Sequence, residues 1–151
     1  LGFMVWYLAS ARRSAFEKYL NESEPHTFSH TVCVYIDVNG LHELNNKHGH
    51  EAGDKLLQSV AECLRAQFPD DGLYRIGGDE FVVFSKADAA VCEARMQAVS
   101  SALAAQDYSI SYGIAAQETT EGLSDLVREA DENMLKNKRC YYAEHDRRRP
   151  R

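Results

Sequence analysis

Three acidic residues in this chain stand where a β-sheet could bring their carboxylates together. Asp79 and Glu80 directly follow a pair of glycines between two β-type runs, and Asp37 directly follows the apolar run over residues 31–36. If these strands are neighbours, Asp37 and Asp79 converge at one rim of the sheet. Hard carboxylate oxygens suit Mg²⁺ or Mn²⁺, which take their other ligands from water and substrate phosphates. The pattern therefore indicates a divalent-metal site for a phosphate compound; the alternative is a helix N-terminal cap at Asp37 and a solvated turn.

The residues around these acids predict particular strands. Gly77 and Gly78 separate short runs over 74–76 and 81–84. A tight primed turn needs positive φ at its central residues, which glycine adopts without a steric clash, so we predict such a turn at the two glycines. The run over 31–36 has β-branched and aromatic residues without polar alternation, which predicts a strand buried on both faces.

Composition limits the class of protein. The 151 residues are 44% hydrophobic and 26% charged, which fits one globular domain over residues 1–151. The net charge of -6 argues against a nucleic-acid-binding face. The cysteines are widely spaced without a C-x-x-C motif, so we expect reduced thiols rather than disulfides or a zinc site. They are Cys33, Cys63, Cys92 and Cys140.

Hydrophobic periodicity predicts an α+β fold. The order of elements contains a β-α-β-β-α-β unit of the ferredoxin-like kind with added helices. After a polar loop over 21–30 we expect a strand over 31–37, a helical turn over 42–47, a helix from 52 to 68, a hairpin ending near 85, a helix over 88–105, a strand over 108–114 and a helix over 123–138. The last helix is expected to turn Leu126, Met134 and Leu135 inward.

The two ends of the chain differ in composition, with an apolar N-terminal end and a basic C-terminal end. Residues 1–10 are an apolar lead, too short for a bilayer that needs about 20 residues. The lead is either the end of a membrane helix, with Arg12 and Arg13 on the cytoplasmic side, or a helix that packs on the sheet. Residues 141–151 are expected to form a basic tail.

Several motifs in register resemble the GGDEF family of diguanylate cyclases over roughly residues 11–140. They are Asp37-Val38-Asn39-Gly40-Leu41, Asn45, Gly49-His50, Gly53-Asp54 and Arg75-Ile76-Gly77-Gly78-Asp79-Glu80-Phe81. The resemblance implies a palm-type antiparallel sheet as in nucleotidyl cyclases. It also implies condensation of two GTP into cyclic di-GMP and pyrophosphate, assisted by Mg²⁺ or Mn²⁺, across a two-fold homodimer.

The same resemblance assigns the reacting centre. It implies that Asp37, the backbone carbonyl of Val38 and Asp79 hold the metal. Two roles are open for Glu80, which either adds a metal contact or takes the proton from the attacking hydroxyl. Asp79, Glu80 and Asp37 are thus the expected catalytic residues.

Substrate contacts are implied at further positions. Asn45 and Asp54 match the guanine-binding pair of the family, although both types also cap helices and form turns. Gly77 and Gly78 let phosphates approach the backbone. Lys138 matches a phosphate-binding lysine, with helix-dipole complementation as the alternative. Arg75 is either an ion-pair or phosphate ligand near the acids or a plain strand-face arginine.

Other positions depart from the family pattern. Asn39 replaces a second acid, His42 a lysine, and Gly40-Leu41 larger residues near the guanine pocket. Tyr142 stands where an arginine is usual, with Arg139 as a candidate substitute, and Ala11 replaces an asparagine in an altered N-terminal element.

The inhibitory motif of the family is also incomplete. Phe68 replaces its arginine while Asp71 is retained, and phenylalanine cannot pair with phosphate. We therefore expect the inhibitory site to be lacking.

These departures keep a second function open. The alternative is a degenerate domain that binds GTP and regulates a partner without turnover, and a third reading is a structural interaction module. We expect low, concentration-dependent activity of the isolated domain. Its setting is expected to be cytoplasmic, in a parent protein with a sensor or membrane domain.

Overall fold

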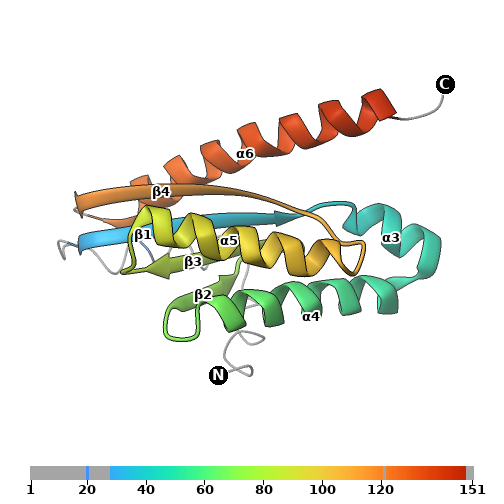
Figure 1. Ribbon diagram of the computed structural model, residues 1–151, viewed down its shortest axis with the longest axis horizontal. Helices are drawn as coiled ribbons and strands as arrows, with labels where there is room; N and C mark the ends of the chain where they lie inside the picture. The colour runs from blue at the N-terminus through green and yellow to red at the C-terminus, as the bar shows by residue number, and fades with distance from the viewer. Residues whose placement is uncertain (1–19, 21–27, 121, 149–151) are drawn as a thin grey trace.

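The computed structural model describes residues 20, 28–120 and 122–148 (Figure 1). Within them lies the α+β architecture expected from the sequence. The elements are β1 (Phe28–Val38), α3 (Leu41–His48), α4 (His50–Gln67), β2 (Gly72–Arg75), β3 (Glu80–Ser85), α5 (Ala89–Ala104), β4 (Ile110–Thr120) and α6 (Leu123–Arg148). The apolar lead over 1–10 and the altered N-terminal element lie outside the described residues.

The sheet is antiparallel throughout and has the strand order β2-β3-β1-β4. Helices α4 and α5 cover one face, and α6 covers the other (Figure 1). Along β1, Val34 and Ile36 pack toward α4 and α5, while Cys33 and Tyr35 pack toward α6. This alternation with apolar residues on both sides confirms that β1 is buried on both faces.

Helix α6 also protects an exposed sheet edge. Because β4 is an edge strand, part of its backbone has no neighbouring strand to bond. The Asn133 side-chain amide donates to the Ile114 carbonyl over 2.9 Å, and the Tyr112 N–H donates to Asn137 Oδ1 over 3.0 Å. The two asparagines, one helical turn apart, therefore fix α6 against β4.

Several element boundaries and one side chain differ from expectation. The hairpin loop spans residues 76–79, and neither Gly77 nor Gly78 has positive φ. The predicted primed turn is therefore wrong, because the four-residue loop reverses the chain without positive φ at either glycine. Leu135, expected inward, is 39% exposed, because Asn133, Met134 and Asn137 form the side of α6 that contacts β4.

Three elements are longer than predicted. Strand β1 begins inside the expected polar loop, and β4 continues to Thr120. The two segments pair with each other from Phe28 opposite Thr120 onward, so each strand supports the other beyond its apolar pattern. Helix α6 runs to Arg148, so most of the expected basic tail is helical.

The cysteines form no disulfide bonds in the described structure. All four cysteines are free, with Cys33 and Cys92 buried, Cys63 half-buried and Cys140 exposed. In the described part of the chain, no helix has both the length and the apolar character that a bilayer span requires.

Candidate metal and nucleotide site

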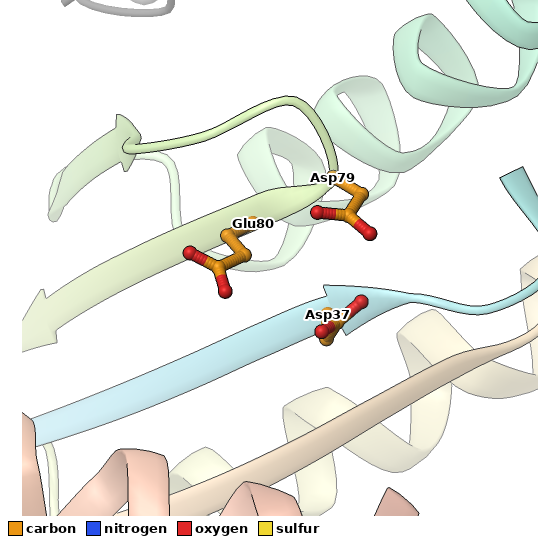
Figure 2. A group of neighbouring side chains, drawn as sticks. All are labelled: Asp37, Asp79 and Glu80. Atoms are coloured by element: carbon orange, nitrogen blue, oxygen red, sulfur yellow. The ribbon is translucent and has the colours of Figure 1, made fainter. Parts of the chain in front are cut away.

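The sheet brings the three predicted acids together. Asp37, Asp79 and Glu80 each offer a carboxylate oxygen, and these oxygens lie within 4.8 Å of one another. Figure 2 shows Asp79 and Glu80 at the start of β3 beside Asp37 near the end of β1. Antiparallel pairing places Asp37 opposite Glu80, and the Val38 N–H donates to the Asp79 carbonyl over 2.8 Å. Backbone pairing therefore sets the cluster.

Asp37 is the most buried of the three acids. Its side chain is 6% exposed, and Lys138 Nζ donates to its Oδ2 over 2.8 Å. Its other oxygen, Oδ1, is buried and has no hydrogen-bond partner. A buried carboxylate oxygen without a donor is costly unless a ligand meets it. The unpartnered oxygen beside two further carboxylates therefore fits a hard divalent cation.

The electrostatic environment of Asp37 is unfavourable to its charge. Burial raises the pKa of Asp37 to about 6; the Lys138 hydrogen bond opposes this change, and the Asp79 charge adds to it. For Lys138, burial lowers the pKa, but the hydrogen bond to Asp37 and the charges of Asp37, Tyr142 and Asp79 together outweigh that effect and the pKa is raised. Lys138 therefore stays charged.

Asp37→Asn is expected to stabilise the fold at alkaline pH. Because the folded-state pKa of about 6 lies above the ordinary 3.8, the charged carboxylate destabilises the fold. This penalty is fully present above pH 6 and is absent well below pH 3.8. Asparagine removes this penalty and keeps an acceptor for Lys138. We expect a gain on the order of 1–3 kcal/mol in unfolding free energy at pH 8, and roughly half of it at pH 5. Urea denaturation at both pH values measures it; an equal gain at both would contradict the assignment.

Glu80 has a partner that the sequence analysis missed. The Tyr35 hydroxyl donates to Glu80 Oε2 over 3.0 Å, and the Tyr35 side chain is fully buried in the α6-facing core. A buried phenol needs such an acceptor. The signal in the sequence was the two-residue spacing from Tyr35 to Asp37, which puts both on one face of β1.

Arg75 organises the glycine loop. Its Nε donates to the Gly77 carbonyl over 3.1 Å and its Nη2 to the Gly78 carbonyl over 2.8 Å. Burial lowers the pKa of Arg75, and the charges of Asp54 and Asp79 oppose this. Arg75 thus lies among the predicted substrate residues, bonded to the loop carbonyls. A Cβ at Gly78 would meet only open space, so this backbone faces away from the core.

Asn45 and Asp54 lie on neighbouring helices. Asn45 is on α3 and Asp54 is an exposed residue within α4, which excludes Asp54 as a helix cap. A Cβ on Gly53 would overlap Asn45 Oδ1, so glycine here leaves room for the Asn45 side chain in its present position. Asn45 Oδ1 is itself buried without a hydrogen-bond partner. It is therefore an acceptor whose hydrogen bond is not made within the described residues.

Asn39 is structural. Its side-chain amide donates to Ser109 Oγ and its Oδ1 accepts from Ser111 Oγ, both over 3.0 Å. The backbone N–H of Asn39 also donates to the Ser109 carbonyl. Asparagine offers both a donor and an acceptor here, whereas an ionised aspartate offers only acceptors. Asn39, in place of the second acid, therefore ties the end of β1 to the start of β4 and leaves the acid cluster intact.

The residues of the expected inhibitory motif are engaged within the fold. Phe68 is fully buried, and the Arg95 guanidinium lies 5.5 Å from its ring centroid. Arg95 Nη1 is also 3.6 Å from Asp71 Oδ2. Arg65 Nη1 donates to the Phe68 and Asp71 carbonyls. Phe68 therefore offers no exposed ring for stacking.

We expect no tight cyclic di-GMP binding at this motif. Phe68 supplies neither a guanidinium nor an accessible face, and Asp71 is already beside a cation. Calorimetry of the wild type should show no submicromolar binding. Submicromolar affinity that is lost in Asp71→Ala would contradict this expectation.

The comparisons with known proteins agree with this geometry. Residues 11–141 match the family model described as "Diguanylate cyclase, GGDEF domain". Because this match covers most of the chain, the protein belongs to the GGDEF domain family. The family expected from the motifs is therefore confirmed.

Among curated relatives, the chain is similar to diguanylate cyclase DgcS of Shewanella oneidensis, with 29% identity over 119 residues, 72% of this chain and 40% of DgcS. It is 34% identical over 133 residues to signaling protein YkoW of Bacillus subtilis, which covers 75% of this chain and 16% of YkoW. The chain thus spans less than half of either relative.

Solved structures share the fold. The GGDEF domain of DgcB from Caulobacter crescentus, in complex with c-di-GMP, matches with a TM-score of 0.70 and 21% identity, covering 85% of this chain and 83% of that one. The GGDEF domain of PA1120 from Pseudomonas aeruginosa matches with a TM-score of 0.66 and 27% identity, covering 87% and 92%. The predicted fold class is confirmed.

Proposed function

We propose that this domain is a diguanylate cyclase that joins two GTP molecules into cyclic di-GMP with release of pyrophosphate. The observation that carries the proposal is the cluster of Asp37, Asp79 and Glu80 with the buried, unpartnered Asp37 Oδ1. Such a cluster beside an open glycine loop fits phosphoryl chemistry, which depends on positioning and charge neutralisation.

The chain would hold Mg²⁺ or Mn²⁺ through the Asp37 and Asp79 carboxylates and the Val38 carbonyl. When bound, the metal neutralises charge on the phosphates and on the attacking and leaving oxygens. Glu80 either joins these ligands or accepts the proton of the attacking hydroxyl. The Tyr35 hydroxyl donates to Glu80 Oε2 and so orients the carboxylate for either role.

The neighbouring groups would hold the nucleotide. Gly77 and Gly78 present backbone to the phosphates, with Arg75 bonded behind them. Asn45 and Asp54 would bind the guanine edge, since a carboxylate accepts from the guanine N1–H and exocyclic amine, a donor pair that adenine lacks. Lys138 would bind a phosphate once released from Asp37.

Asp54→Ala is expected to weaken GTP binding about tenfold to a hundredfold, because a charge-assisted pair of hydrogen bonds to guanine is lost. ATP binding should change less than about twofold, because adenine offers no matching donors. Titration with each nucleotide measures both effects, and Glu62→Ala, an exposed carboxylate on the same helix, is the matched control. Equal losses for GTP and ATP would remove Asp54 from the guanine site.

The reaction requires two domains. One domain binds one GTP, so two copies must face each other about a two-fold axis to join both ends. We therefore propose a homodimer as the active species, in the cytoplasm where GTP is available. The longer relatives support a parent protein in which a sensor or membrane domain brings two copies together.

The second candidate is GTP binding without turnover. It is favoured by Tyr142, an exposed aromatic one turn after Lys138 where the family pattern has a cation. Incubation of a forcibly dimerised protein with GTP and Mg²⁺, followed by mass detection, separates the two candidates. Cyclic di-GMP formation that is absent in an Asp79→Ala control establishes the cyclase. A GTP-dependent rise in melting temperature without product establishes the binding module.

A further inference from the structure

The cluster of acids already contains a cation that belongs to the protein. Lys138 Nζ lies 2.8 Å from Asp37 Oδ2, across 101 residues of sequence. The Asp37 side chain is 6% exposed and the Lys138 side chain 30% exposed. The ammonium therefore reaches the most buried acid from the solvent-exposed side.

The fold holds Lys138 at this position. The preceding residue, Asn137, accepts a hydrogen bond from the β4 backbone, and Asn133 donates to β4 one turn earlier. Asp37 lies opposite Ser111 of β4, next to the Tyr112 that bonds Asn137. The position of Lys138 over Asp37 is thus fixed by α6, while its four-carbon stem remains flexible.

A divalent ion and the Lys138 ammonium compete for one carboxylate. An ion on Asp37 Oδ1 would be a few ångströms from an ammonium on Oδ2, in a partly buried setting where like charges repel strongly. Lys138 would have to leave Asp37. If it found no new partner, the ion pair would be lost without replacement. Polyphosphate supplies that partner, because its oxygens accept from an ammonium.

We propose that Lys138 is the resident counter-cation of the acid cluster and that it moves from Asp37 to a phosphate group when metal and nucleotide bind. The proposal rests on the proposed function and adds to it an order of events. Bare metal binds weakly because Lys138 opposes it, and metal binds well together with a polyphosphate. By linkage, each of the two ligands raises the affinity for the other.

The test is Mn²⁺ binding to the full chain without nucleotide, followed by the resonance of free Mn²⁺ and by calorimetry. Lys138→Met keeps most of the side-chain volume and removes the competitor, so we expect Mn²⁺ to bind about fivefold to tenfold tighter than to the wild type. Lys138→Arg retains the cation and should keep the weak binding. Lys136→Met, at an exposed lysine of the same helix, makes the same change in net charge and should alter affinity less than about twofold.

A second set of titrations adds tripolyphosphate or a non-hydrolysable GTP analogue. In the wild type we expect either compound to tighten Mn²⁺ binding, and the gain should be smaller in Lys138→Met. Urea denaturation of each variant confirms that it is folded. If folded Lys138→Met binds Mn²⁺ no more tightly than the wild type, while the wild type binds Mn²⁺ normally with the analogue present, the movement of Lys138 from Asp37 to phosphate is overturned. The metal-dependent function is not affected by that result. Failure of all variants to bind Mn²⁺ even with the analogue overturns the metal-dependent function as well.

Discussion

Asp79→Asn is expected to lower cyclic di-GMP formation by about a thousandfold or more in a dimerised protein. The change removes one negative charge and one metal-ligating oxygen from the cluster, and metal stabilisation of phosphoryl transfer is worth several kcal/mol. The fold should be kept, since Asp79 is half-buried in the loop and its backbone carbonyl still accepts from Val38. Initial rates by mass detection and unfolding by urea give the two quantities.

The matched control is Asp125→Asn. Asp125 is an exposed aspartate of α6 that pairs only with the exposed Arg128 in the described structure, and such surface pairs contribute little. Its activity should equal that of the wild type within about twofold. If Asp79→Asn retained activity within a few fold while folded, the acids would not form the reacting centre.

Gly113→Ala is expected to give the largest loss of stability. A Cβ at Gly113 would collide with the α6 backbone at Ala130, Asn133 and Met134. Backbone atoms cannot rotate away as a side chain does, so α6 would have to shift from β4. We expect a loss of about 3 kcal/mol in unfolding free energy, measured by urea denaturation.

Gly78→Ala is the stability control for this change. A Cβ there meets nothing within 4 Å, so the unfolding free energy should change by no more than about 0.5 kcal/mol. A similar small effect of Gly113→Ala would show that α6 is not held closely on β4. The position of Lys138 over Asp37 would then lack the support described above.

The α+β fold and the acid cluster were accessible from sequence because their signals are local. Asp37 directly follows an unbroken apolar run near the end of β1, and Asp79 and Glu80 follow the glycines. The order of elements permits few topologies. The sequence-based prediction was wrong at the hairpin, where the usual rule for paired glycines did not hold. The paired glycines suggested a primed turn, yet a four-residue loop braced by Arg75 connects the strands.

The tertiary structure alone decided the contacts between distant segments. The ion pair of Lys138 with Asp37 and the bond of Tyr35 to Glu80 join residues 101 and 45 positions apart, and no local pattern selects such partners. The close approach at Gly113 likewise depends on where α6 lies across β4. The sequence by itself determined which side chains can bind a metal, because residue type and spacing set that chemistry. Packing decided which partners hold them, because a hydrogen bond needs atoms within about 3 Å.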